Sequence, residues 1–233
     1  MGKIPENMLP PKEFWPEYVV PEEFADTPDE LNLTDFLLDR HVREGRGDNV
    51  AIKFMDQNVT YAQLQEMVNK FGNSLKNENV ESQDRVGIRL VNSIQALVAV
   101  FAIEKIGAIP VPTSPLWSGE EVAFVANNAE MKFFIVNAPL MPPVEQAKPN
   151  FQCGTRVITI GGNADEVKAA GNLVFEEMLE AGSPDLEATM LKGDDIGIML
   201  YTSGTTGMPK GCVHFIRPIV IETRMVNKHV YKM

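Results

Sequence analysis

The sequence has no long hydrophobic run and very little cysteine or histidine. Within its 233 residues no apolar stretch approaches the ~20 residues that a membrane-spanning helix needs. The N-terminus lacks the apolar segment of a secretory signal peptide, which makes the cytoplasm the expected compartment. The two cysteines, Cys153 and Cys212, lie far apart and the three histidines are scattered, so neither a structural metal nor a redox pair is expected.

Positive charge is also scarce. Lys and Arg number 21 against 32 Asp and Glu, which gives a formal net charge of −11. Binding to nucleic acid or to an anionic membrane depends on an excess of basic residues, so we expect no nucleic-acid partner and no membrane partner. An anionic small molecule would need a local cluster of donors.

The first half of the chain begins with an arm and continues into a helical pattern. Residues 1–30 are rich in proline and acidic side chains, which predicts an extended N-terminal arm. Its aromatic residues are expected to pack on the body of the protein: Phe14, Trp15, Tyr18 and Phe24. A helix is expected from about Thr34, followed by a β-hairpin at residues 51–61. Thr60 and Gln63 then form a capping box before apolar residues at helical spacing: Leu64, Met67, Val68, Phe71 and Leu75.

From residue 84 onward, strand-like and helix-like segments alternate. Strands are expected at residues 85–90, 108–113, 131–136, 156–160 and 195–201, and helices at residues 93–106, 118–128 and 172–180. This alternation predicts an α/β fold with a single, mostly parallel sheet flanked by helices. Ligands of such sheets bind beyond the carboxyl ends of the strands, which is where the loop after Tyr201 would emerge.

That loop has the composition of a phosphate-binding segment. Residues 202–211 read Thr-Ser-Gly-Thr-Thr-Gly-Met-Pro-Lys-Gly. Glycines let the backbone approach an anion, hydroxyls add neutral donors, and consecutive N–H groups can form a concave anion nest. Lys210 adds positive charge, and Pro209 stiffens the approach to it. The predicted ligand-binding residues are Thr202, Ser203, Gly204, Thr205, Thr206, Gly207 and Lys210.

Two other kinds of phosphate-binding loop and a flexible linker fit this segment less well. A Walker A loop needs Gly-Lys-Ser/Thr, whereas Lys210 lies between Pro209 and Gly211, and no G-x-G-x-x-G follows a strand. A flexible linker would share the composition, but this segment follows an apolar strand directly and ends in Pro-Lys-Gly. For Cys212 and His214, packing is favoured over chemistry, so no catalytic residue is assigned.

The loop and Tyr201 before it resemble the signature of the acyl-adenylate-forming superfamily, which includes the AMP-forming acyl-CoA synthetases. Further similarity lies upstream, in Thr60-Tyr61-x-x-Leu64, Asp84-Arg85-Val86 and Ile106-Gly107-Ala108, so the resemblance covers most of residues 34–214. It implies part of the large N-terminal domain of such an enzyme. It also implies a carboxylate substrate, ATP, Mg²⁺ and coenzyme A, with an acyl-adenylate formed before acyl-CoA.

Several motifs of that superfamily do not occur in the sequence. There is no Tyr-Gly-x-Thr-Glu segment, no Thr-Gly-Asp segment and no lid carrying the adenylating lysine. Residues 215–233 show no clear amphipathic period, so we divide the chain into an arm (1–30), a partial AMP-binding domain (31–214) and a divergent tail (215–233).

Two functions remain open at this stage. The chain is a truncated acyl-CoA synthetase that is inactive by itself, or it is a nucleotide-binding remnant or subunit that needs a second polypeptide. Self-association is a further expectation, because the strand after the loop would leave an apolar edge exposed. The leader, residues 9–17, resembles that of 2-aminobenzoate- and benzoate-CoA ligases, which points to an aromatic or medium-chain acid.

Overall fold

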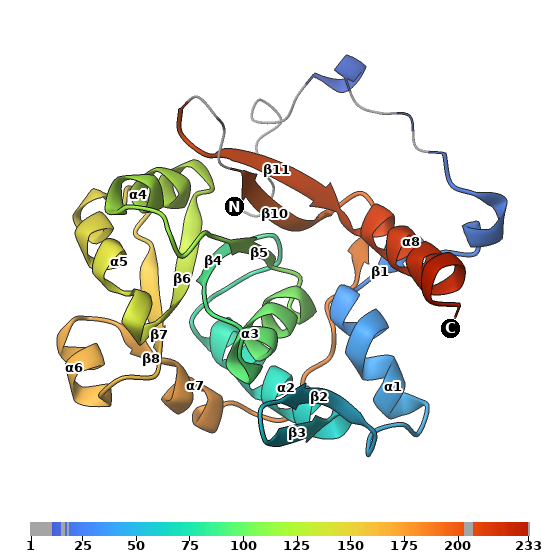
Figure 1. Ribbon diagram of the computed structural model, residues 1–233, viewed down its shortest axis with the longest axis horizontal. Helices are drawn as coiled ribbons and strands as arrows, with labels where there is room; N and C mark the ends of the chain where they lie inside the picture. The colour runs from blue at the N-terminus through green and yellow to red at the C-terminus, as the bar shows by residue number, and fades with distance from the viewer. Residues whose placement is uncertain (1–10, 15–16, 18, 203–206, 233) are drawn as a thin grey trace.

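A five-stranded parallel sheet forms the centre of the molecule (Figure 1). The structure is a computed structural model, and it describes residues 11–14, 17, 19–202 and 207–232. The strand order is β5-β4-β6-β7-β8, and every neighbouring pair is parallel. The strands are β4 (Arg85–Arg89), β5 (Ile109–Pro112), β6 (Met131–Asn137), β7 (Arg156–Ile160) and β8 (Leu173–Val174). The predicted α/β class with a mostly parallel sheet is confirmed.

Each face of this sheet is covered by helices, because the side chains of a strand alternate between the two faces. Phe133 and Ile135 of β6 belong to one buried cluster, together with apolar residues of α2 (Tyr61–Asn77), α3 (Ile94–Lys105) and α7 (Phe175–Ala181). Phe134 and Val136 belong to another, with residues of α4 (Gly119–Asn128) and α5 (Pro142–Ala147). The sheet is therefore buried on both sides.

The long helices begin where the sequence predicts. Both members of the capping box at Thr60 and Gln63 are in place at the start of α2, and Ser118 and Glu121 form the same arrangement at the start of α4. Ser93 caps α3 by accepting a hydrogen bond from the Ala96 backbone N–H at 3.1 Å. Each cap satisfies backbone donors that the first turn of a helix leaves unpaired.

Smaller elements surround this framework. A π-helical turn (Asp35–Asp39) leads into α1 (Arg40–Arg43), and β2 (Val50–Phe54) pairs with β3 (Gln57–Thr60) as the predicted hairpin. The predicted helix at residues 172–180 is corrected at its start, because β8 precedes α7 there. The prediction missed α5, α6 (Ala164–Ala169) and the short antiparallel pair of β1 (Glu30–Leu31) with β9 (Leu191–Lys192).

The strand before the loop is not part of the parallel sheet, which corrects the expectation of a single sheet. β10 (Ile196–Thr202) pairs with β11 (Lys210–Phe215) in an antiparallel two-stranded sheet. Only residues 203–209 connect the two strands, and so short a connection permits antiparallel pairing but no parallel crossover. The hairpin lies beside β5 in Figure 1.

The C-terminal segment is helical. Sequence analysis found no clear amphipathic period at residues 215–233, whereas α8 (Ile216–Val226) buries Ile216 and Val220 against Leu31 and Leu33. The sequence pattern did not predict this helix, because only two of its residues are buried. A π-helical turn (Asn227–Tyr231) follows.

The N-terminal arm is only partly packed. Phe24 is 2% exposed, as expected for an aromatic residue packed on the body, but Phe14 is 73% exposed and its short 3-10 turn buries no residue. Trp15 and Tyr18 lie outside the described residues. Among the residues that the structure describes, no helix is long and apolar enough to cross a membrane.

Candidate phosphate-binding site

The ends of the predicted phosphate loop are fixed by the β10–β11 hairpin. Thr202 is the last residue of β10, Lys210 is the first residue of β11, and the two form a cross-strand pair. Gly207 also lies within the described part of the loop. The other predicted ligand-binding residues, Ser203, Gly204, Thr205 and Thr206, fall outside the described residues.

Gly207 has a backbone conformation that favours glycine. Its φ is +114°, which side chains of L-residues rarely allow, and nothing described lies within 4 Å of the position that a Cβ would take. Pro209 is buried and anchors the chain between Gly207 and Lys210. The space beside Gly207 is therefore open among the described residues, while Pro209 next to it is buried.

The charge of Lys210 is available to a ligand. Its side chain is exposed, and it forms no ion pair with any residue in the part of the chain that the structure describes. Thr202 beside it is also exposed. An ammonium group and a hydroxyl at the two ends of a glycine-containing loop fit the phosphates of a nucleotide.

Tyr201 connects the hairpin to the five-stranded sheet and the helices packed on it, which we call the sheet domain. Its hydroxyl donates a hydrogen bond to Asn128 Oδ1 at 2.6 Å, and its ring meets Trp117 edge to face at 6.4 Å between centroids. Burial raises the pKa of Tyr201 to about 12, so the phenol keeps its proton at neutral pH. Sequence analysis missed Trp117 and Asn128, and the only sequence signal for them was the position of Tyr201 immediately before the loop.

The cysteines and histidines take no part in a metal site that the structure reveals. Cys212 and His214 are exposed on β11, and Cys153 is exposed as well. Across residues 11–14, 17, 19–202 and 207–232, no group of three His, Cys, Asp or Glu side chains is arranged to hold a metal ion.

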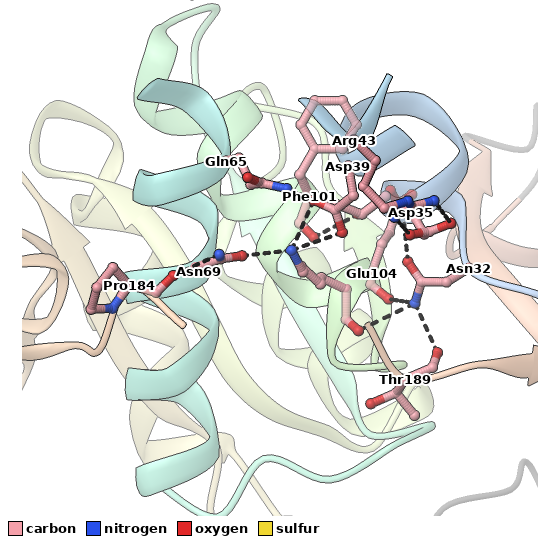
Figure 2. A network of polar contacts seen from close by, with 12 residues as sticks. Asn32, Asp35, Asp39, Arg43, Gln65, Asn69, Phe101, Glu104, Pro184 and Thr189 are labelled. Atoms are coloured by element: carbon pink, nitrogen blue, oxygen red, sulfur yellow. Dashed lines mark hydrogen bonds and ion pairs between the residues drawn. The ribbon is translucent and has the colours of Figure 1, made fainter. Parts of the chain in front are cut away.

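A buried polar network lies elsewhere, between the first helices (Figure 2). Lys105 on α3 is 1% exposed, and its Nζ donates to Asp39 Oδ1 at 2.8 Å and to Asn69 Oδ1 at 2.6 Å. Gln65 also donates to Asp39 Oδ1, at 2.8 Å. The network joins the π-helical turn before α1 to α2 and α3, so we assign it to the stability of the domain.

One open groove is also separate from the loop. It has a volume of about 470 Å³ and lies over β3 and α2, where its lining includes Gln57, Asn58, Gln63 and Glu66. It contains no lysine or arginine, which a phosphate ligand would favour.

Known proteins of similar sequence are CoA ligases. A 3-hydroxybenzoate-CoA/4-hydroxybenzoate-CoA ligase of Thauera aromatica is 26% identical over 85% of this chain and 38% of its own length. An acetyl-coenzyme A synthetase of Alcanivorax borkumensis is 32% identical over 86% of this chain and 34% of its own length. The chain thus spans between a third and two fifths of the length of these curated relatives.

Solved structures agree with this similarity. An anthranilate CoA ligase in complex with anthranoyl-AMP superposes with a TM-score of 0.82 at 27% identity, covering 88% of this chain and 39% of that one. A benzoate CoA ligase from Burkholderia xenovorans superposes with a TM-score of 0.74 over 87% of this chain and 38% of that one, and at 21% identity it supports the fold alone.

The family profile extends beyond the loop. The profile described as AMP-binding enzyme matches residues 38–232. The match includes most of the segment that sequence analysis set apart as a divergent tail, and it contains the sheet, the hairpin and α8. The chain belongs to the AMP-binding enzyme family, and its fold is that of the N-terminal domain of adenylate-forming enzymes.

Proposed function

We propose that this chain supplies the phosphate-binding part of an AMP-dependent acyl-CoA ligase. Such an enzyme joins a carboxylate to the α-phosphate of ATP, releases pyrophosphate, and passes the acyl group to coenzyme A. The observation that carries the proposal is the loop between Thr202 and Lys210, whose lysine is exposed and has no ion pair among the described residues, in a chain of the AMP-binding family.

The loop has a defined chemical task in this proposal. Negative charge develops on the leaving pyrophosphate, and preorganised donors stabilise it without reorganising. Backbone N–H groups and the hydroxyls of Thr202, Ser203, Thr205 and Thr206 would hold the β- and γ-phosphates, and Lys210 would offset their charge. Bound Mg²⁺ would share that neutralisation.

For the carboxylate we propose an aromatic or medium-chain acid. The leader resembles that of benzoate-type ligases, and the similar proteins include a hydroxybenzoate-CoA ligase and an anthranilate CoA ligase. The acetyl-coenzyme A synthetase among the similar proteins shows that family membership alone does not define the acid.

We further propose that the 233-residue chain has no turnover by itself and needs a second polypeptide or further sequence for catalysis. The sequence contains no Thr-Gly-Asp carboxylate for the ribose and no lid lysine for the α-phosphate. Misplacing reacting groups by about 1 Å can cost on the order of a hundredfold in rate. A nucleotide-binding remnant without catalysis is the second candidate, and the absent motifs favour it for the isolated chain.

Titration calorimetry tests the binding proposal. ATP and pyrophosphate, each with Mg²⁺, are expected to bind weakly, and adenosine is expected not to bind, because the sequence contains the proposed phosphate loop but no Thr-Gly-Asp carboxylate for the ribose. Lys210→Ala should abolish the signal, whereas Lys53→Ala, which removes an exposed lysine on β2, should not. Adenosine binding, or unchanged ATP binding in Lys210→Ala, would refute the site.

An exchange assay tests the catalytic proposal separately. With ATP, Mg²⁺ and benzoate, 2-aminobenzoate or a medium-chain fatty acid, the chain should show no carboxylate-dependent exchange of labelled pyrophosphate into ATP. Exchange that disappears in Lys210→Ala would show instead that this chain is an active ligase by itself.

A further inference from the structure

Tyr201 lies at the point where the phosphate loop leaves the hairpin, and its side chain contacts both strands and the sheet domain. It precedes Thr202 on β10 and is the cross-strand partner of Gly211, which follows Lys210 on β11. Movement of this side chain would therefore displace both ends of the loop together.

The ring of Tyr201 occupies the space beside Gly211. A Cβ at Gly211 would lie 3.0 Å from Tyr201 Cζ and 3.2 Å from its hydroxyl oxygen. These distances are shorter than ordinary van der Waals contacts, so a side chain at residue 211 would require the ring to shift by a few tenths of an ångström. The φ of Gly211 is not positive, so the close approach of the ring, and not the backbone conformation, favours glycine here.

Two residues of the sheet domain hold the ring from the other side. Asn128, at the end of α4, accepts the hydrogen bond from the hydroxyl. Trp117, which precedes α4 and is 6% exposed, provides the edge-to-face contact. One contact therefore connects the hairpin to the end of α4, and the other connects it to the segment just before α4.

Arg89 at the end of β4 fixes the segment that carries Trp117. Its side chain is 1% exposed, and its guanidinium donates to the carbonyls of Ser114, Pro115 and Trp117 at 2.6, 2.8 and 3.0 Å. Burial lowers the pKa of this guanidinium, while the negative charge of Glu121 opposes that shift. The three carbonyl contacts hold residues 114–117 against the end of β4.

We propose that Tyr201 is a positioning residue for the phosphate loop, held by Asn128 and Trp117, with Arg89 fixing Trp117. The inference rests on the proposed function, because it needs a loop that binds phosphates. Tyr201 itself would not touch the ligand. It would keep Thr202 and Lys210 at a fixed separation from the sheet domain.

A double-mutant cycle on the full chain tests the hydrogen bond. Tyr201→Phe and Asn128→Ala each remove the same bond, so each should weaken Mg²⁺-pyrophosphate binding by about two- to fivefold, and the double variant should lose no more than either single variant. Tyr231→Phe is the matched control, because Tyr231 is 63% exposed and forms no such bond. Multiplying losses in the double variant, or equal losses in Tyr231→Phe, would overturn the inference.

Tryptophan fluorescence provides a readout that loss of stability alone does not produce. The chain has two tryptophans, so Trp15→Phe leaves Trp117 as the single reporter. Pyrophosphate should then change the emission of Trp117, and Tyr201→Leu in this background should abolish the change while the circular dichroism spectrum stays that of the folded chain. An unchanged response in the folded Tyr201→Leu variant would overturn the inference.

The two proposals fail in different ways. If the unmodified chain binds no pyrophosphate, the proposed function is wrong and the positioning role is wrong with it. If the chain binds pyrophosphate, Lys210→Ala abolishes binding, and Tyr201→Phe and Asn128→Ala leave it unchanged, only the positioning role is wrong.

Discussion

The sheet domain and the hairpin-plus-helix unit, β10, β11 and α8, are stabilised in different ways. The sheet domain buries apolar clusters on both faces of five strands. The hairpin-plus-helix unit has few buried side chains, because no residue of β11 is fully buried and α8 buries only Ile216 and Val220. The described ends of the phosphate loop belong to this less buried unit.

Charged contacts compensate in part for the narrow apolar face of α8. Arg217 pairs with Asp29 at 2.9 Å, Arg224 with Asp26 at 2.9 Å, and Lys228, just beyond the helix, with Glu23 at 2.5 Å. Arg224 also lies 5.2 Å from the centre of the buried Phe24 ring. We call this set of contacts between the N-terminal arm and the C-terminal helix the clasp.

The difference in burial between the two regions indicates which of them unfolds locally more easily. Exposed ion pairs contribute little free energy, and segments with few buried apolar contacts open locally at low cost. We therefore expect the unit that carries the loop to open more easily than the sheet domain, and the following predictions test this from the largest effect to the smallest.

Asp39→Ala should destabilise the sheet domain most. It would leave the Lys105 ammonium buried without its carboxylate, which typically costs about 3–5 kcal/mol. Urea unfolding followed by circular dichroism measures the loss. Glu177→Ala is the control, because the Lys168–Glu177 pair is about half exposed and solvent screens it, so its loss should change stability far less. Similar losses in both variants would show that burial does not distinguish the two pairs.

Glu104→Gln should remove a pH dependence of stability that arises where the sheet domain meets the hairpin-plus-helix unit. Glu104 lines a small cavity of about 10 Å³ with uncharged residues of both regions, including Leu33, Ile196 and Ile216. Burial raises the pKa of its carboxyl from 4.5 to about 8. The folded state therefore holds a proton that the unfolded chain releases, and stability falls as pH rises from about 4.5 to about 8.

Thermal unfolding at pH 5.5 and pH 8 measures this effect. The glutamine side chain cannot ionise. The free energy of unfolding of Glu104→Gln should therefore exceed that of the unmodified chain by an amount that grows with pH and reaches about 2 kcal/mol at pH 8, allowing for partial exposure of the glutamate. Parallel stability curves for the two proteins across this pH range would contradict the assignment.

Arg224→Met should loosen the clasp with little effect on global stability. It removes the pair with Asp26, the 2.9 Å hydrogen bond to Thr27 Oγ1 and the contact with Phe24. The free energy of unfolding should fall by less than about 1 kcal/mol, while thermolysin should cut α8 faster. High salt should accelerate cleavage in the unmodified chain in the same way.

Arg156→Met provides the matched control for the clasp. Arg156 pairs with Glu78 and lies 5.2 Å from the centre of the Phe133 ring, so it has the same kinds of contact within the sheet domain. It should leave the cleavage of α8 unchanged. Equal acceleration in both variants would mean that α8 opens only when the whole molecule unfolds.

Local sequence patterns predicted much of the sheet domain. The capping box at Thr60 and the apolar period after it depend only on neighbouring residues, and the structure confirms them. The pairing of β10 was not predictable from its apolar character, because an apolar strand can join any sheet. Only the short connection to β11 indicates the antiparallel hairpin.

The candidate site was predictable only in part. The composition of the loop pointed to Thr202, Gly207 and Lys210, whose roles stay predictions. It did not point to the residues that contact Tyr201, where the loop leaves β10. Trp117 and Asn128 reach Tyr201 across more than 70 positions of sequence, and Arg89 acts through backbone carbonyls that leave no sequence pattern. The basic residues of α8 and of the turn after it have acidic partners about 190–205 positions away in the arm, which no local sequence pattern indicates.

Hydrogen exchange with and without Mg²⁺-pyrophosphate tests the central claim most directly, because it locates the bound phosphates. The account predicts slower exchange in peptides that contain the end of β10 and the start of β11, with the strands of the parallel sheet unchanged. Protection over β3 and α2, where the open groove lies, or no protection anywhere at saturating pyrophosphate, would contradict a phosphate site between Thr202 and Lys210.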